Sequence, residues 1–511
     1  MTGKTMTRFG KARVCHALVL GGMLLIGAAG ATARNNPEDQ VQKSFEKTIS
    51  LTGNQGVSLD NRFGNVHVSG GSGHDVKINA TIHVQAKSKE EAQEFADKIQ
   101  IDVQQSGDGV HVRTVYPDDH SKYVLHIQWK KTSYSVDYDV TVPVDAPLWV
   151  RNDFGNVETS GVRGWARIEN GHGAIDVKDA GQTKLTNAFG RIELNNASGN
   201  STIVNNNGSV EATNIKGTLD IKNRFGSIVA SQIGGATTIS GGNGSVELTN
   251  VSGGASVNNT FGNVSARTIN GNLNLHNSNA KVEVFDVTGN AELVTSFGEL
   301  DVERVGGALS VGDNNGQVNA REIHGIANIK TSFGRIVATN LYGAANLVTG
   351  NGNIEANGIG GDLYAKTSFG SLDLRNIKGN LTAQNSNGAV TAANVSGDGG
   401  VDTSFGGVSL SAIGGKVRVD NQNGAIEVST SSDNCRDVSL KTSFSHILVR
   451  VPSNGGYKVS ARTSFGRISS ELPITSTGTI GSEVLNGTIG NGACTLELTN
   501  SNGSIEIAKS R

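Results

Sequence analysis

Gly262 to Asn279 read GNVSARTINGNLNLHNSN, and this stretch decides the fold class. Counted from its glycine, the apolar residues stand at positions 3, 5, 8, 12 and 14. Alternation at positions 3–5 and again at 12–14 is typical of two short β-strands, and the glycine at position 10 predicts a turn between them. The change of phase between positions 5 and 8 predicts a bend. Each such unit is therefore expected to complete one full coil.

The unit repeats through the middle of the chain with a period of about 18 residues, which predicts a solenoid. Position 18 alternates between Phe and Asn, and His172 and Asn279 fill two of the slots between phenylalanines. No proline lies between Pro147 and Pro452, which indicates one continuous hydrogen-bonded array, because proline cannot donate to a sheet ladder. The phenylalanines that mark the period are Phe154, Phe189, Phe225, Phe261, Phe297, Phe333, Phe369 and Phe405.

We therefore expect an all-β fold, a parallel β-solenoid with coils of about 18 residues, right-handed like most parallel connections. A wider coil of about 36 residues, which would stack Phe directly on Phe, is one alternative. An antiparallel meander or propeller is another. A propeller blade has distinct inner and outer strands, whereas two successive units here share one apolar pattern.

The Phe at position 18 is interpreted as interior packing beside a glycine that permits a tight corner. A narrow coil would not hold a ring on every rung, so a small Asn would leave room between rings, and its amide could bond to turn backbone. By this account Phe at Asn315 would overpack against Phe297 and Phe333. The functional alternative is a binding groove lined by aromatic rings.

Position 4 is expected to point outward, and acidic residues occupy it in most units, including Glu158, Asp176, Glu193 and Glu211 in succession. Stacked carboxylates repel one another, and a cation such as Ca²⁺ would relieve the repulsion. The repeat lacks an Asp-rich nonapeptide turn, so a solvated face is the preferred interpretation. No metal site and no cofactor are predicted.

Both ends of the array depart from the repeat. Residues 34–147 are expected to form a small α+β cap, with a helix over Ser88 to Gln100 that begins at a capping box of Ser88 and Glu91. This region also holds one coil motif around Phe63. Residues 148–430 form the regular array. In residues 431–511 the spacing lengthens, which predicts irregular closing coils.

The segment 1–33 resembles a secretory signal peptide. A basic segment precedes an apolar run, and Ala31-Thr32-Ala33 fits a cleavage site. We expect the chain to be exported to the periplasm, the cell surface or the medium. Cleavage leaves 40 basic and 46 acidic residues, a balance that argues against a nucleic-acid partner. The remaining sequence has no apolar stretch long enough to cross a membrane.

Cys435 and Cys494 are the two cysteines that remain after cleavage. Export would permit a disulfide between them. Stacking in chain order, however, places them three coils apart, farther than a disulfide spans. Two unpaired thiols are therefore the preferred prediction, and a bridge that requires the last coils to fold back is the alternative.

From residue 40 to residue 511 the chain resembles a bacterial adhesin-like family built of Gly/Asn-rich β-strand repeats, a domain-of-unknown-function group. The segments that carry the resemblance are VSLDNRFGNVHVSG near Phe63, YDVTVPVDAPLWVRNDFGNVETSG from Tyr138 to Gly161, and the recurring TSFG and NSNG corners. The resemblance implies an exported or membrane-attached β-helix. It implies no catalytic residues.

The sequence carries no specific catalytic, nucleotide-binding or metal-binding motif. We expect a non-enzymatic envelope or surface protein, adhesin-like, whose long face binds a glycan, a protein or the cell wall. A carbohydrate-active β-helix enzyme, a polysaccharide lyase or hydrolase, is the alternative. Such enzymes need clustered acids on neighbouring coils and a cleft built by loop insertions. The regular coils here have almost no insertions, which favours binding or scaffolding.

Overall fold

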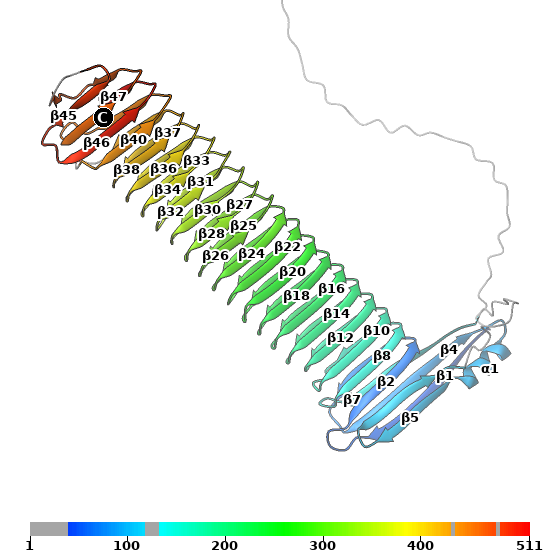
Figure 1. Cartoon of the computed structure of the whole chain (residues 1–511). Helices are drawn as coiled ribbons and strands as arrows, with labels where there is room; N and C mark the ends of the chain where they lie inside the picture. Colours follow the sequence, from blue (N-terminus) through cyan, green and yellow to red (C-terminus); the bar gives the residue numbers. More distant parts are fainter. Residues whose placement is uncertain (1–38, 118–131, 431–434, 477–480, 511) are drawn as a thin grey trace, which may run out of the picture.

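The computed structural model describes residues 39–117, 132–430, 435–476 and 481–510. Over these residues the chain forms a long parallel β-solenoid with a small head at its N-terminal end (Figure 1). The predicted fold class is confirmed, while handedness stays a prediction. The predicted signal segment, 1–33, lies outside the described residues. Within the described ranges, no helix has the length and apolarity to span a membrane.

Each regular coil contributes one strand to each of two sheets, here called sheet A and sheet B. In the deciding unit these strands are β21 (Val264–Ile269) in sheet A and β22 (Leu273–Asn279) in sheet B. Val264 pairs in parallel with Val282, its equivalent in the next unit, and Leu273 pairs with Ala291 in the same way. The prediction that one unit makes one coil is therefore confirmed. The wider coil of two units and the antiparallel meander are excluded for the solenoid.

The interior of the solenoid consists of the apolar residues that define the repeat. Positions 3, 5, 8, 12 and 14 of the deciding unit are all buried. The predicted bend lies at position 7, where Thr268 has a φ of 57°. Asn214 and Asn250 adopt the same left-handed conformation, which Asn tolerates better than most residues. The bend returns position 8 to the interior, which explains the change of phase in the apolar pattern.

Position 16 adds a buried polar row that the sequence analysis did not predict. In the first half of the solenoid it is usually Asn. Asn259 is fully buried and donates from Nδ2 to the carbonyl oxygens of Gly244 and Gly262, both at 3.2 Å. In the second half Thr is more common, and Thr349 donates to the Gly334 carbonyl oxygen at 3.0 Å. The row therefore satisfies carbonyl groups at the corner where sheet B ends.

The head closes the N-terminal end of the stack. Strands β1 (Gln40–Ser50), β4 (Asp75–Gln85) and β7 (Ser133–Pro143) pair antiparallel, and β7 pairs in parallel with β3 (Val66–Gly71), which continues sheet A into the solenoid through β9 (Val157–Ser160). The antiparallel strands thus extend one sheet of the solenoid beyond its first coil.

The predicted helix is α1 (Lys89–Lys98), and it packs on β1 and β4. Ser88 caps it, accepting a hydrogen bond from the backbone N–H of Glu91 as the capping box requires. Ala92 and Ala96 lie buried on the apolar side of the helix. The helix therefore covers the antiparallel strands of the head.

Sheet B begins in the head as well. Strand β5 (Gln100–Ser106) pairs antiparallel with β6 (Gly109–Val115), and β6 pairs in parallel with β2 (Gly56–Phe63). Strand β2 then pairs with β8 (Leu148–Phe154), so that Phe63 is the register partner of Phe154. The coil motif around Phe63 therefore stacks directly on the first regular coil.

The C-terminal end does not stack in chain order. Strand β46 (Cys494–Asn500) pairs in parallel with both β40 (Val438–Thr442) and β42 (Tyr457–Arg462). The last coil is therefore inserted between two earlier ones. Its second strand repeats the insertion in sheet A, where β47 (Ile505–Lys509) pairs with β41 (Ile447–Val451) and β43 (Ile468–Ser470).

Cys435 and Cys494 form a disulfide, with their Cα atoms 5.9 Å apart. The prediction of two unpaired thiols is wrong. It assumed stacking in chain order, whereas the insertion of the last coil places Cys494 beside the coil that starts at β40. The fold-back that the alternative required is the arrangement that the chain adopts.

Candidate functional site

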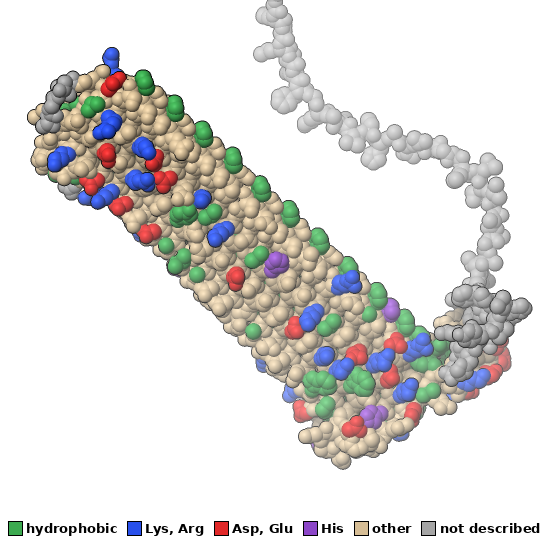
Figure 2. Space-filling view, viewed as in Figure 1, with side chains coloured by type: hydrophobic (Ala, Val, Ile, Leu, Met, Phe, Trp, Pro, Cys, Tyr) green, Lys and Arg blue, Asp and Glu red, His purple; other side chains and the backbone are tan. Residues whose placement is uncertain are grey.

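The residues at position 18 form one straight row along a long edge of the solenoid, here called the corner row. Successive members are register partners, as in Phe189 with Asn207 and Asn207 with Phe225. From Phe154 onward the phenylalanines of the row are between 39% and 77% exposed. Figure 2 shows hydrophobic side chains at regular intervals along this edge. The prediction that these rings pack in the interior is therefore wrong.

The corner itself turns the rings outward. In β12 (Thr183–Phe189) the buried residues alternate up to Asn187, and strict alternation would also bury Phe189. Asn187 instead donates from Nδ2 to the Gly173 carbonyl oxygen at 2.8 Å. The alternation ends there, and Phe189 is half exposed. The Asn187 amide, and not the Phe189 ring, is therefore the last side chain of β12 that points inward.

Rings do occupy successive coils at the N-terminal end of the row. The Phe63 and Phe154 ring centroids lie 5.3 Å apart, those of Phe154 and His172 4.6 Å, and those of His172 and Phe189 4.9 Å, with nearly parallel planes. The steric explanation for the alternation of Phe and Asn is therefore wrong, because a ring fits on every rung.

The asparagines of the row have a backbone role instead. Asn387 and Asn423 donate from Nδ2 to the carbonyl oxygens of Ser368 and Ser404, each at 3.3 Å. Each of these serines precedes a phenylalanine of the row. The prediction that the amide bonds to turn backbone is confirmed. Each such Asn thus fixes the corner that carries the ring of the preceding coil.

The alternation continues through the inserted C-terminal coil. Asn502 donates from Nδ2 to the Ser443 carbonyl oxygen at 3.1 Å, which places it next to Phe444. The backbone N–H of Phe465 donates to the Ser501 carbonyl oxygen, so Phe465 follows Asn502 in the row. In space the row therefore reads Phe, Asn, Phe, although Asn502 comes after both phenylalanines in the chain.

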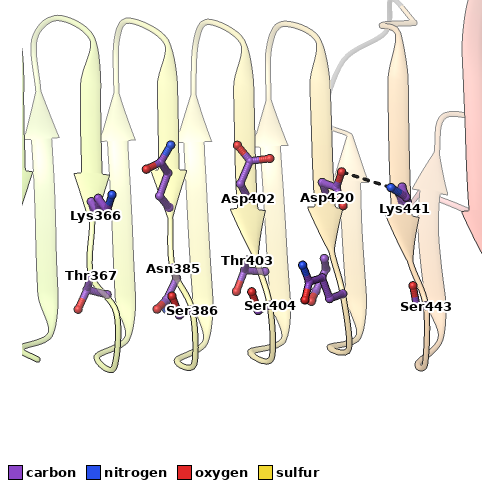
Figure 3. Close-up of a pocket in the computed structure, with 13 residues that line it drawn as sticks. Lys366, Thr367, Asn385, Ser386, Asp402, Thr403, Ser404, Asp420, Lys441 and Ser443 are labelled. Atoms are coloured by element: carbon purple, nitrogen blue, oxygen red, sulfur yellow. Dashed lines mark ion pairs between the residues drawn. The ribbon is translucent and has the colours of Figure 1, made fainter. Parts of the chain in front are cut away.

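A polar groove of about 460 Å³ runs beside the C-terminal part of the corner row (Figure 3). Its residues come from five neighbouring strands of sheet B, and the wall residues Ser386, Ser404 and Ser443 each precede a member of the row. Polar side chains and a line of rings thus run in parallel. The five strands are β32 (Leu363–Lys366), β34 (Leu381–Gln384), β36 (Gly399–Thr403), β38 (Val417–Asn421) and β40.

Four charged side chains line one wall of the groove, and their charges cancel. Lys366, Asp402 and Asp420 stand at position 15, and Asp420 has Asp402 and Lys441 as its register partners on the two sides. Lys441 Nζ lies 3.6 Å from Asp420 Oδ2. Arg418, beside the groove, lies 3.1 Å from the Asp402 carboxylate and 3.9 Å from that of Asp420. Each of the two carboxylates therefore has a cationic partner.

Residues of the buried polar row at position 16 form the floor of the groove. Asn385 and Asn421 donate to glycine carbonyl oxygens at the corner. Thr367 does the same at 2.9 Å. The hydroxyl of Thr403 differs, since it has no hydrogen-bond partner among the described residues although the residue is only 6% exposed. The floor is thus fixed, with one polar group left unsatisfied.

The acidic row at position 4 lies on the outside of sheet A, as predicted. Asp176 is the register partner of Glu158 on one side and Glu193 on the other. Arg191 lies 3.0 Å from Asp176 and 3.6 Å from Glu193, and the hydrogen bond to Asp176 raises the pKa of the arginine. Basic side chains thus offset part of the repulsion. Among the described residues, no group of three or more His, Cys, Asp or Glu side chains is arranged to hold a metal ion.

A second hollow, of about 650 Å³, lies where β3 meets the first coils. Several of its lining residues are glycines or other small residues, and its charged side chains are Arg163, Asp179 and Lys216. None of the described residues that line this hollow, or that line the groove beside the corner row, is aromatic. It lies at the turns that follow the sheet A strands, on the edge opposite the corner row.

The sequence analysis named no catalytic, cofactor-binding or metal-binding residues, and it missed the groove. The available signal was the recurring TSFG and NSNG corners, which place a small polar residue before each Phe or Asn. What could not be foreseen was the outward direction of the ring, because period-2 alternation from position 12 turns position 18 inward.

No family model matches the sequence, and no curated protein matches it. Three solved structures are similar. A candidate cell adhesion protein from Clostridium sporogenes is 7% identical, with 92% of this chain and 100% of that one covered, at a TM-score of 0.16. A candidate adhesin from Bacteroides fragilis is 13% identical, with 57% and 97% covered, at 0.20.

The third is a candidate lipid binding protein from Parabacteroides distasonis, 11% identical, with 63% and 96% covered, at a TM-score of 0.17. At these TM-scores the likenesses carry no argument about function. Membership of the Gly/Asn-rich repeat family stays a prediction.

Proposed function

We propose that this chain is an exported, non-enzymatic envelope or surface protein, adhesin-like, that binds an extended ligand along the edge of its solenoid. The observation that carries the proposal is the corner row, in which phenylalanines recur on one exposed edge over the whole regular array. Apolar rings in water cost free energy, which binding of a partner over them would recover.

The rings of the corner row contribute little to the interior, which supports a role outside the fold. The interior is complete without them, since mostly Val, Ile, Leu and Ala fill positions 3, 5, 8, 12 and 14, and mostly Asn and Thr fill position 16. Beyond the stack at Phe63 to Phe189, the phenylalanines of the row have no ring partner among the described residues. A partner molecule would remove these exposed rings from water.

Binding is tested with the purified protein on arrays of immobilised glycans and envelope proteins. A variant with Phe333→Ser, Phe369→Ser and Phe405→Ser should lose the binding that the wild-type protein shows. Ile326→Ser is the matched control, because Ile326 is 55% exposed but lies in the turn on the opposite edge. Equal binding by the triple variant and the wild type would contradict the proposal.

Export is tested separately by expressing the full chain in a bacterial host and fractionating the cells. We expect protein outside the cytoplasm whose N-terminus is the residue after Ala33, as the signal-peptide prediction assigns. Uncleaved protein confined to the cytoplasm would contradict this part of the proposal.

A carbohydrate-active enzyme is the second candidate, and one observation favours it. Asp402 and Asp420 are carboxylates on neighbouring coils of one groove, as a hydrolase would need. Their ion pairs with Arg418 and Lys441 suit a binding surface better, because a general acid needs a carboxyl group that holds its proton. Turnover on a panel of polysaccharides that is lost in Asp402→Asn would favour the enzyme.

A further inference from the structure

From Phe189 onward the corner row presents a ring on every second coil. Neighbouring coils of a parallel sheet lie ~4.8 Å apart, so successive phenylalanines of the alternating part recur at about 10 Å. This spacing is not imposed by crowding, because Phe154, His172 and Phe189 stack on successive coils at the other end of the row. The alternation is a property of the surface that needs its own explanation.

The C-terminal coil shows that the spacing is kept in space as well as in sequence. Phe444 and Phe465 belong to consecutive units of the chain, and stacking in chain order would put their rings on adjacent rungs. The inserted coil instead brings Asn502 between them. The rings therefore recur on every second coil even where the order of the coils in space differs from their order in the chain.

The groove adds hydrogen-bonding groups along the same line. Serines on its wall and Gln384 and Gln422 supply hydroxyl and amide groups on successive coils. A ligand that fits must therefore combine an apolar face that recurs every second coil with polar groups on each coil.

An extended β-1,4-linked polysaccharide has this combination. One pyranose unit is about as long as the spacing between coils, and successive units are flipped, so the same apolar C–H face recurs every second unit. Its hydroxyl groups point to the sides, where they can reach polar side chains. Binding sites of this kind pair an apolar platform with a few placed polar groups.

The charge of the groove selects among such polymers. Lys366, Lys441 and Arg418 outnumber Asp402 and Asp420 by one, and Arg418 and Lys441 are paired with the two carboxylates. One excess positive charge offers only a weak field to a polyanion such as a polyuronate, and it opposes a polycation. A neutral chain is the better match.

We propose that this groove binds a neutral, extended β-1,4-linked polysaccharide that lies along the solenoid axis. Alternate sugar units stack on Phe369, Phe405 and Phe444, and the units between them lie over Asn387 and Asn423. This inference rests on the proposed function and names the ligand class for the same edge.

The test is calorimetric titration of the full chain with cellohexaose and with chitohexaose, which are about long enough to span the groove. Maltohexaose is the matched control, because its α-1,4 linkages remove the alternation of faces while the number of sugars is unchanged. We expect at least one β-1,4-linked hexamer to bind and maltohexaose not to bind. Equal affinity for the α-linked hexamer would overturn the inference.

Variants then locate the site. Phe369→Ala and Phe405→Ala should each weaken binding about tenfold, as the loss of one ring contact predicts. Tyr342→Ala is the control, because this aromatic ring is 54% exposed but lies in the turn on the opposite edge, and it should leave the affinity of a hexamer unchanged. Equal losses in all three variants would show that the groove is not the site and would overturn the inference.

The spacing is tested with Asn387→Phe, which places rings on three successive coils. We expect weaker binding of the β-1,4-linked hexamer, because the added ring displaces the sugar between Phe369 and Phe405. Unchanged or tighter binding would contradict the proposed match between the spacing of the rings and the repeat of the polysaccharide.

Failure of this inference is distinguishable from failure of the proposed function. If neither β-1,4-linked hexamer binds while the triple serine variant loses binding to another ligand on the arrays, the ligand class is wrong and the proposed function stands. If the row variants change no binding on the arrays at all, both are wrong.

Discussion

The two halves of sheet B follow one sequence repeat and yet present different surfaces. In the first half a strand such as β22 runs through to the corner residue, and the corner glycines Gly262 and Gly298 have φ values of 121° and 124°. In the second half β34 ends at Gln384, three residues before the corner, and Gly370 and Gly388 are outside the left-handed region. The groove lies in the second half.

The difference teaches that the alternation of Phe and Asn does not determine the shape of the corner, because it runs through both halves. The change begins near Asp313, a buried residue of the position-16 row. Its carboxylate accepts hydrogen bonds from the hydroxyls of Thr295 and Thr331 and from the backbone N–H of Gly316. The polar row inside the solenoid thus changes in chemistry where the outer surface changes in form.

The largest expected effect concerns the two ends of the stack. Antiparallel strands and a helix close the N-terminal end, whereas a disulfide ties in the inserted coil at the other. Cys494→Ala should lower the local free energy of opening of β46 by ~2–4 kcal/mol. Hydrogen exchange of the β46 amides measures it. Cys435→Ala should give the same loss, and the double variant should give no further loss. Unchanged protection of the β46 amides would show that the hydrogen bonds between strands hold the coil without the disulfide.

The next effect compares the position-16 row in the two halves. Asn259→Ala removes donors to two carbonyl oxygens in a fully buried place and should cost roughly 2–3 kcal/mol. Thr349→Val removes one donor and keeps the shape, so about 1–2 kcal/mol is expected. Chemical denaturation followed by circular dichroism tests the order. A larger loss of stability for Thr349→Val than for Asn259→Ala would contradict the expected contributions of the buried Asn and Thr side chains.

A smaller effect separates the two ends of the corner row. Phe154→Ala removes stacking with Phe63 and His172 and should cost about 1–2 kcal/mol. Phe405→Ala removes an exposed ring without a ring partner among the described residues, so less than ~1 kcal/mol is expected. Thermal unfolding of the two variants side by side tests this. Equal losses would mean that the rings of the alternating part do support the fold.

The smallest effect is expected for Asn315→Phe. Asn315 is exposed between Phe297 and Phe333, and a ring there can stack as His172 does between its neighbours. Only one long hydrogen bond, 3.5 Å to the Ser296 carbonyl oxygen, is lost. The stability should change by less than ~0.5 kcal/mol. A loss above ~2 kcal/mol in chemical denaturation would restore the steric explanation of the alternation.

Much of the fold could be predicted from the sequence, because apolar periodicity reports directly on which side chains face inward. The buried residues of the deciding unit, from Val264 to Leu275, and the bend at position 7 all follow from it. The repeat length then gives the parallel register. The helix over Lys89–Lys98 was predictable from its capping box and apolar stripe.

The site could not be predicted, for two physical reasons. First, the direction of the rings depends on hydrogen bonds such as that of Asn187 with Gly173, which end the alternation before position 18. Second, the order of coils in space differs from their order in the chain, so the distance between Cys435 and Cys494 could not be obtained by counting units. Both depend on contacts between coils, which one sequence does not display.

The inserted coil also affects the order in which the chain can assemble. Most of the stack can grow vectorially, each new coil docking on the one just delivered. In the folded protein, however, β40 pairs with β46 (Cys494–Asn500), which lies near the end of the chain. The C-terminal end of the stack therefore stays unfinished until the last residues of the chain are available. A chain released early would keep an open strand edge at its tip, where it could join end to end with another copy.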